Sequence, residues 1–474
     1  MQSSETEFVP WSEVLRFDLA GRLILVSLGV WLHAADGLVV ATMMPEIVAR
    51  IGGEVYVAWA VALYELGSIL AAASAALLAR HFGLRRPMSA AAMVFAGGCL
   101  ISALAASMEI LLFGRLLQGL GGGALVSLSF VSVVRLFPTR LTARVMAIVS
   151  LLWGASAFMG PLIGGLFVEY ASWRWGFGFF AGQAVLLAVW IFATAGFAER
   201  KEASESAARP PLARLFVLAL AVLCVAYAGI RPDVLRTGML MLAGLACLLW
   251  FARMDSHQSG DQRLMPPHPF DLRKPVGAAL VMMFSMNAAT MGLATYGALL
   301  LVSIHGTTLL MAGYVLAGVA VGWTTAALLS SGAPERLDAR NIALGMSMAF
   351  VSVVALYFAV PHGPVAAIAA CAVLEGVGFG LAMTFTVRRA RRMVSADEIE
   401  RLTGAMSTLG RFGYAVGASF TGIVANAAGF AADNSVIEAQ HVARMIFTAN
   451  IGFAALGLVA AFSFVRPRTR MQPV

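Results

Sequence analysis

The feature that most constrains this chain is a series of apolar segments, each long enough to cross a lipid bilayer. A transmembrane helix needs about 20 mainly apolar residues, and in lipid only helices or closed barrels satisfy their own backbone polar groups. Only 12% of the 474 residues are charged, against about 25% in an average soluble protein. The sequence therefore predicts an all-α polytopic membrane protein. We expect fourteen helices, at about 22–48, 55–79, 87–107, 110–136, 143–168, 174–197, 212–230, 236–252, 275–304, 307–331, 340–360, 364–387, 402–429 and 443–465.

The distribution of positive charge favours fourteen segments with both termini in the cytoplasm. With that topology only five of the 33 Lys and Arg residues fall in outer loops, and two, Arg115 and Arg411, lie within helices. All the others fall in cytoplasmic loops and termini, in agreement with the positive-inside rule. An odd number of helices would place basic loops on both sides. The net charge of +8 therefore reflects topology, and we expect no nucleic-acid partner.

An internal repeat divides the chain into two halves. With an offset of 257 residues, Gln118–Gly121 aligns with Glu375–Gly378. We predict six-helix bundles at 1–198 and 275–474, joined by linker loops with two extra transmembrane helices at 199–274. Such paired bundles are a transporter architecture, with the substrate site near the membrane midplane between them. The two extra helices have no repeat partner, so we expect them to be peripheral and to face lipid.

Three ionisable side chains interrupt the apolar segments of the first half. They are Asp36, Glu65 and Arg115. A charge at such depth costs roughly 2.5 to 3.5 kcal/mol on insertion scales, so each side chain should face the protein interior or a wet cavity. Arg115 keeps its charge and favours the ionised form of the carboxylate that it approaches, whereas burial favours the protonated form of the other. We expect these residues to couple transport to protons; the alternative is a permanent structural ion pair.

Other polar residues inside predicted helices are candidates for binding a substrate. They are Glu375, Asn287, Tyr296, Gln118 and His33. Polar residues at membrane depth mark substrate and ion pathways, but they also form ordinary hydrogen bonds between helices. The sequence leaves both interpretations open.

Several motifs resemble those of the major facilitator superfamily, in particular the fourteen-helix branch of drug:proton antiporters. The first helix has Asp36 with a Pro nine residues later and an Ile two beyond it, and the fourth has Arg-x-x-Gln-Gly-x-Gly from Arg115 onward. The thirteenth-helix pattern of the branch is met by Arg411 with two following glycines. The fifth helix carries the antiporter pattern Gly-Pro-x-x-Gly-Gly, formed by Gly160, Pro161, Gly164 and Gly165. Small residues at this spacing let helices approach closely, and the proline bends the helix.

One loop departs from the family pattern. Between the second and third helices the family has Gly-x-x-x-Asp-x-x-Gly-Arg-Lys/Arg, and this chain retains Gly83, Arg85 and Arg86. The first Gly is Ala76 and the Asp position is Arg80. We expect the retained residues to take part in the conformational change, although the charge relay of the family loses its acid here.

The resemblance implies a proton-coupled secondary transporter that exports amphipathic small molecules or drugs by alternating access. The departures leave open an importer, or a transporter of one dedicated metabolite, with the same fold. We expect no enzymatic activity, because the ionisable residues are spread over separate helices, and no ATP drive, because GxxxxGK[ST] is absent. We expect no cofactor and no metal, with the proton gradient as energy source. The expected partners are a small-molecule substrate, protons and the lipid bilayer, in a monomer of the bacterial inner membrane.

Overall fold

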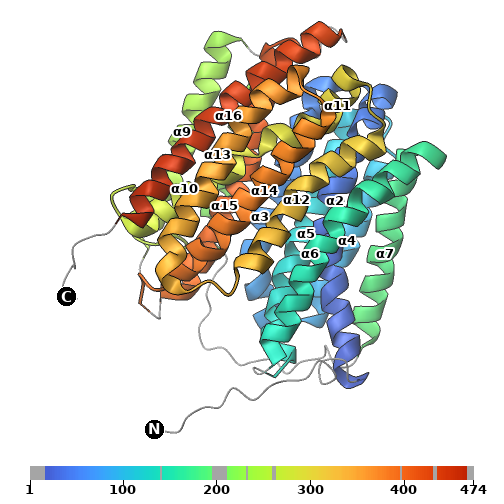
Figure 1. The fold of residues 1–474 in the computed structure, drawn as a ribbon. Helices are drawn as coiled ribbons and strands as arrows, with labels where there is room; N and C mark the ends of the chain where they lie inside the picture. The colour runs from blue at the N-terminus through green and yellow to red at the C-terminus, as the bar shows by residue number, and fades with distance from the viewer. Residues whose placement is uncertain are drawn as a thin grey trace.

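The structure, a computed structural model, describes residues 17–138, 141–194, 211–230, 233–258, 263–395, 398–430 and 435–466. Within these ranges the chain is helical, without strands. Figure 1 shows long helices that run alongside one another, with the first half (blue to teal) beside the second half (yellow to red). The first turn of α2 and the last turn of α16 lie at the same, lower end of the bundle in that view.

The first half contains six long helices. The turn between the first two is built on glycine, because Gly52 and Gly53 have φ of 68° and 85°, a region that side chains disfavour. The sixth is capped by Ser172, the residue before its first turn, whose side chain accepts a hydrogen bond from the Arg174 backbone N–H. The helices are α2 (Phe17–Ile51), α3 (Val57–Phe82), α4 (Arg85–Ala103), α5 (Met108–Leu136), α6 (Thr142–Tyr170) and α7 (Trp173–Ala193), with the 3-10 turn η1 (Glu54–Tyr56) between α2 and α3.

The two extra helices differ from each other in their surroundings. α9 (Val234–Ser256) exposes most of its length, and only 11% of its most apolar stretch is buried. α8 (Leu212–Ala228) instead buries residues along one whole side and packs against α3 of the first half and α15 of the second. α9 is thus peripheral, whereas α8 exposes one face, with Phe216 69% exposed, and packs its other face beside the junction of the halves.

The second half repeats the plan of the first, with one broken helix. α10 and α11 together form one apolar stretch, Pro275–His305, interrupted at Thr290. There the Thr290 hydroxyl donates to the Asn287 carbonyl (2.9 Å), a local bond that competes with the helical ladder. The helices are α10 (Pro275–Ala289), α11 (Met291–His305), α12 (Leu309–Ser330), α13 (Asp338–His362), α14 (Val365–Arg391), α15 (Ile399–Ala427) and α16 (Val436–Val465), with the 3-10 turn η5 (Glu335–Leu337).

Each expected apolar segment has a helix at its position in the described part of the chain. Twelve of these stretches are long and apolar enough to span a membrane. The two that fall outside that set are α8, which has 17 residues, and α15, which is rich in Gly, Ser and Thr and carries Arg401 and Arg411. The protein is thus a multi-pass membrane protein.

Helix packing repeats between the halves with the offset that the sequence shows. α5 packs on α3 and α4 as α14 packs on α12 and α13, and α4 meets α7 as α13 meets α16. The close contacts also match, because a Cβ on Gly119 would overlap the Tyr64 carbonyl oxygen and one on Gly376 would overlap that of Val319. Only glycine permits such backbone contact, which explains why these glycines align.

The halves meet through α2, α3 and α6 on one side and α11, α12 and α15 on the other. At the end where α3 begins, the Asn426 amide donates to the Val55 carbonyl (2.9 Å) and to the Gly229 carbonyl (2.8 Å). A Cβ on Gly165 would lie 3.1 Å from Leu310 Cβ. The first half, the second half and α8 are therefore in contact at this end of the bundle.

Candidate functional site

The centre of the candidate site is a buried ion pair within the first half. Arg115 of α5 donates to the Asp36 carboxylate of α2 at 2.5 Å, and the two side chains are 3% and 2% exposed. Arg115 lies within a helix that otherwise has only Gly, Gln and apolar neighbours around it, so its charge needs such a partner. Of the two carboxylates that the sequence offered to Arg115, the structure selects Asp36.

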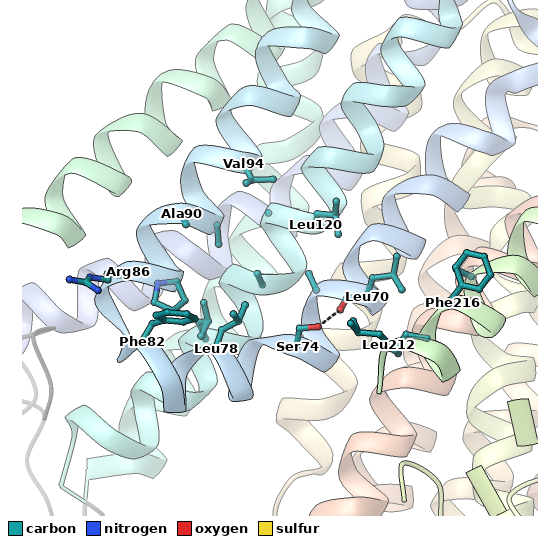
Figure 2. Close-up of a pocket in the computed structure, with 18 residues that line it drawn as sticks. Leu70, Ser74, Leu78, Phe82, Arg86, Ala90, Val94, Leu120, Leu212 and Phe216 are labelled. Carbon is teal, nitrogen blue, oxygen red and sulfur yellow. Dashed lines mark hydrogen bonds between the residues drawn. The ribbon is translucent and has the colours of Figure 1, made fainter. Parts of the chain in front are cut away.

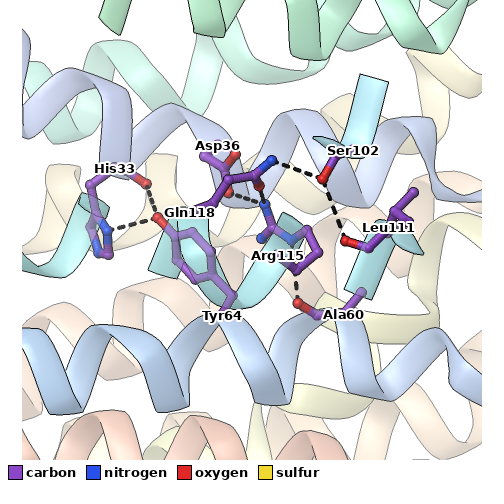
Figure 3. Close-up of polar contacts among 8 residues, drawn as sticks. All are labelled: His33, Asp36, Ala60, Tyr64, Ser102, Leu111, Arg115 and Gln118. Carbon is purple, nitrogen blue, oxygen red and sulfur yellow. Dashed lines mark hydrogen bonds and ion pairs between the residues drawn. The ribbon is translucent and has the colours of Figure 1, made fainter. Parts of the chain in front are cut away.

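The guanidinium of Arg115 makes further contacts besides the ion pair. Its Nε donates to the Ala60 carbonyl at 3.3 Å, and its guanidinium lies 4.3 Å from the centre of the Tyr64 ring, a cation–π contact. Gln118, one turn later in α5, accepts a hydrogen bond from Arg115 and donates to the Ser102 hydroxyl at 3.1 Å. The Gln118 amide thus links Arg115 to Ser102, as Figure 3 shows.

Tyr64 connects this ion pair to His33. The Tyr64 hydroxyl lies 2.7 Å from His33 Nδ1 and 3.4 Å from the His33 carbonyl oxygen, and the two rings stack (Figure 3). Arg411 Nη1 approaches His33 Nε2 at 3.2 Å. Because a guanidinium only donates, Nε2 accepts and Nδ1 carries the proton toward Tyr64. This assignment gives a neutral imidazole, and the Tyr64 hydroxyl then donates to the His33 carbonyl.

Arg411 brings a second positive charge from the other half of the protein. It lies in α15, and its Nη1 contacts Ser68 Oγ at 2.7 Å and Glu65 Oε2 at 3.3 Å, both in α3. The side chains of Arg411 and Glu65 are 16% and 14% exposed, so this pair is less enclosed than the first. It spans the junction between the halves.

The resulting set, called here the charged chain, is Asp36, Arg115, Tyr64, His33, Arg411 and Glu65. With both carboxylates ionised it holds two positive and two negative charges, which offset one another in a low-dielectric interior. Four members come from α2 and α3 and one from α5, and only Arg411 comes from the second half. A relative movement of the halves therefore changes the surroundings of Glu65 while the Asp36–Arg115 pair can remain intact.

The other candidate residues of the second half lie outside the charged chain. Glu375 of α14 is 1% exposed, and neither carboxylate oxygen has a hydrogen-bond partner among the described residues. The position equivalent to Arg115 is Ala372, so the basic partner found in the first half has no counterpart in α14. A buried carboxyl group without such a partner is stable in its protonated form, or in its ionised form with a bound cation beside it.

Asn287 and Tyr296 flank the break between α10 and α11. The Asn287 amide donates to the Met283 carbonyl at 2.7 Å, and Tyr296 packs edge-to-face on Phe430. The Tyr296 hydroxyl is buried without a partner among the described residues. Broken helices often form substrate sites in transporters, which keeps these two positions as candidates.

The Gly-Pro-x-x-Gly-Gly motif of α6 lies where this helix contacts α2 of its own half and α12 of the second half. A Cβ on Gly160 would lie 2.8 Å from Leu38 Cβ, and one on Gly164 would lie 3.0 Å from the Val39 carbonyl oxygen, both in α2. Gly165 faces α12, and Pro161 lies against Gly313 of α12. The motif thus sets the distance of α6 from its own half and from the other half.

The loop motif that this chain keeps only in part, with Gly83, Arg85 and Arg86, lies at the turn between α3 and α4. Gly83 ends α3 with φ of 72°, which accounts for the glycine. Arg85 stacks over Phe192 of α7, with 5.1 Å from the guanidinium carbon to the ring centre, and Arg86 is exposed. The side chains of Ala76 and Arg80 lie outside the described set.

The equivalent turn of the second half carries an acid–base cluster. Asp338, fully buried at the start of α13, pairs with Arg388 and Arg392 at the end of α14. Arg392 also pairs with Glu335. The second half therefore has an acid at this turn, whereas the sequence of the first half has Arg80 where the family has Asp.

The sequence interpretation missed several members of the site. It did not pair Arg411 with Glu65 or place Tyr64 between His33 and Arg115. Arg411 was detectable as a charge inside an apolar segment. Tyr64 gave no such indication, because an aromatic residue in a membrane helix is commonly a packing residue.

Comparisons with known proteins agree with this architecture. The sequence model of the Major Facilitator Superfamily matches residues 26–333, more than half of the chain. This chain belongs to the Major Facilitator Superfamily. A protein of Mycobacterium tuberculosis described as a probable multidrug-efflux transporter is 28% identical over 98% of both chains. Azole resistance protein 1 of Saccharomyces cerevisiae is 34% identical over 34% of this chain and 26% of its own.

Solved structures with little sequence identity share the fold. A bacterial homologue of the human lysosomal transporter Spinster, in an inward-facing and unoccupied conformation, has a TM-score of 0.67 at 14% identity, covering 95% of this chain and 97% of its own. The nucleoside transporter NupG has a TM-score of 0.64 at 11% identity, covering 94% and 98%. The family match and the similarity over 98% of the chain to a transporter indicate that this major facilitator protein is a membrane transporter and not an enzyme.

Proposed function

We propose that this transporter is a proton-coupled antiporter that exports amphipathic small molecules or drugs by alternating access. The observation that carries the proposal is the pairing of Glu65 with Arg411 across the junction of the halves. The similarity over the whole chain to a mycobacterial protein described as a probable multidrug-efflux transporter supports the export of drugs. The energy source is the proton gradient, with no cofactor.

The location of Arg411 suggests how proton binding is linked to conformation. While the halves touch, the guanidinium stabilises the ionised form of Glu65. When the halves rock apart around the substrate site, Glu65 loses this counter-charge, and a carboxylate in a membrane interior then favours its protonated form. Proton uptake thus accompanies one conformation and proton release the other.

Asp36 has a different role in this scheme. Its partner Arg115 belongs to the same half, so the ion pair persists through a rigid-body movement. Asp36 positions Arg115, which holds Tyr64 by a cation–π contact and, through it, His33. We therefore assign proton exchange to Glu65 and a positioning role to Asp36.

The topology belongs to the same proposal. α8 and α15 cross the membrane together with the twelve longer apolar stretches, which gives fourteen spans and two cytoplasmic termini. The side where α3 begins then faces outward. The transporter acts as a monomer in the bacterial inner membrane.

Transport into proteoliposomes tests the proton coupling. Purified protein is reconstituted, a pH gradient is imposed, and uptake of a fluorescent lipophilic cation is compared with exchange of the same dye without a gradient. We expect Glu65→Gln to lose gradient-driven uptake at least tenfold and to retain exchange, because the substrate path is intact while the titrating group is gone.

The matched control is Glu109→Gln, which removes an exposed carboxylate at the start of α5. Equal gradient-driven uptake by Glu65→Gln and the unmodified protein would refute the role of Glu65. If uptake of several dyes is absent even for the unmodified protein, an importer or a transporter of a dedicated metabolite becomes the better interpretation.

A further inference from the structure

A groove with a volume of about 790 Å³ lies on the surface of the first half, outside the charged chain. Its walls come from α3, α4 and α5 on one side and from α8 on the other. Figure 2 shows its lining, with Arg86 and Phe82 at one end, Leu70 and Ser74 near the middle, and Phe216 at the other end.

The walls of the groove offer almost no polar group. Of the eighteen lining residues only Ser74 and Arg86 have polar side chains, and the Ser74 hydroxyl donates to the Leu70 carbonyl of its own helix at 3.2 Å. Water needs two to four polar partners to be held in a cavity, and these walls do not supply them. A hydrocarbon chain, in contrast, loses nothing by lying against such walls.

Arg86, the one charged residue of the eighteen that line the groove, lies near the ends of α3, α4 and α8. α3 ends at Phe82, α4 begins at Arg85 and α8 begins at Leu212, so the groove starts at the membrane boundary. Arg86 is exposed at this level and Phe82 is 56% exposed. From Arg86 the wall continues along α4 to Val94, about 12 Å further into the apolar region at 1.5 Å per residue.

We propose that this groove is a binding site for an anionic phospholipid of the cytoplasmic leaflet. One acyl chain lies between α4 and α8, and the headgroup phosphate accepts hydrogen bonds from Arg86. A guanidinium is suited to phosphate, and a basic residue at the headgroup level attracts anionic lipids. The choice of leaflet rests on the topology given with the proposed function.

The location of the groove gives this lipid a structural consequence. α8 packs on α15 of the second half as well as on α3, so a lipid between α4 and α8 braces the first half against a helix that contacts both halves. Bound lipid therefore stabilises the arrangement of the halves seen here. Removing it should make the protein easier to unfold.

Native mass spectrometry of the purified full-length protein tests the site. The protein is titrated with phosphatidylglycerol or phosphatidylcholine, and both the retained lipid adducts and the shift in the thermal unfolding midpoint are measured. We expect tighter retention and a larger shift with phosphatidylglycerol. Arg86→Gln should weaken phosphatidylglycerol binding about fivefold, the value of one basic residue at a membrane surface. Ala90→Phe, which fills the groove, should weaken binding of both lipids.

Two control variants separate the site from general lipid contact. Arg85→Gln removes the same charge from the neighbouring position, where the side chain stacks on Phe192 outside the groove. Met93→Phe adds bulk to an exposed position of α4 that does not line the groove. Both should bind phosphatidylglycerol like the unmodified protein.

Equal retention of the two lipids, or an unchanged affinity in Arg86→Gln, would overturn the proposal. So would Ala90→Phe abolishing dye transport while phosphatidylglycerol binding is unchanged, because the groove would then be an entry path for the transported compound. The lipid measurement needs no transport activity, so it can succeed or fail independently of the proposed antiport.

Discussion

At the scale of single residues, the two carboxylates of the first half differ in where their partners come from. Asp36 pairs within its own half and Glu65 pairs with Arg411 of the other half. The proposed function therefore assigns two roles to the same chemical group, according to which half of the protein carries its arginine partner. Glu375 is a third case, because its carboxyl group has no hydrogen-bond partner among the described residues and alanine stands at the position equivalent to Arg115.

The positioning role of Asp36 predicts a non-additive stability effect. Asp36→Asn leaves Arg115 as a buried charge without its counter-ion, which typically costs about 3 to 5 kcal/mol. The double variant Asp36→Asn/Arg115→Gln removes both charges and should recover part of that loss. Unfolding in detergent, followed by a double-mutant cycle, measures the coupling. Additive effects of the two substitutions would show that the pair contributes nothing as a pair.

Glu375 predicts a dependence on substrate charge. An unpartnered carboxyl group is suited to a cationic ligand, which supplies the missing positive charge. Glu375→Gln should therefore raise sensitivity to lipophilic cations at least fivefold in growth assays and leave protection against neutral compounds unchanged. A uniform loss of protection against both classes would instead indicate a role in coupling or folding.

At the scale of helices, glycine decides how closely elements approach. α6 lies against α2 because Gly160 and Gly164 leave room for Leu38 and the Val39 carbonyl. The same helix faces α12 through Gly165, so one element connects the first half to the second. Larger side chains at these glycine positions of α6 should therefore impair the relative movement of the two halves more than the folding of the protein.

Gly164→Val tests this element. Its Cβ would lie 3.0 Å from the Val39 carbonyl oxygen and 3.2 Å from Thr42 Cβ, so α6 must shift, at a cost of about 1 to 3 kcal/mol. We expect the protein to remain in the membrane and dye export to fall at least tenfold. Gly182→Val in α7 is the matched control, because nothing lies within 4 Å of its added Cβ. Export by Gly164→Val at the unmodified rate would exclude close packing as a requirement.

At the scale of the whole molecule, two similar halves meet along α3, α6, α12 and α15, and α8 lies beside that junction. Alternating access requires the contacts across the junction to break and re-form. Among the described residues, polar contacts across this interface include those of Arg411 with Glu65, Ser68 and His33, and that of Asn426 with the Val55 carbonyl. A covalent link between the halves should therefore stop transport.

A disulfide between α6 and α12 tests this requirement. A Cβ on Gly154 lies 4.0 Å from Thr324 Cβ, within the range of about 3.5 to 4.5 Å that a disulfide needs. In a background without the four native cysteines, Gly154→Cys/Thr324→Cys should lose export on mild oxidation and recover it on reduction. Each single cysteine variant should be insensitive to the oxidant. Full export by protein shown to be cross-linked would contradict the rocking movement.

The sequence by itself determined the helices, the repeat between the halves and the residues that are charged at membrane depth. These follow from the length and hydropathy of each segment and from the spacing of glycines, which are local properties. The motifs on α5 and α6 are local in the same sense, because each lies within a single helix. What the sequence could not supply is the rotation of each helix, because helices that are apolar on every side give no indication of which face looks inward.

The tertiary structure decided the partners. It joined Arg115 to Asp36 and Arg411, 346 positions away along the chain, to Glu65. It placed α8 against both halves and broke the ninth apolar segment at Thr290. Each of these depends on the packing of side chains from distant segments, which determines whether a buried charge finds a counter-ion or remains alone.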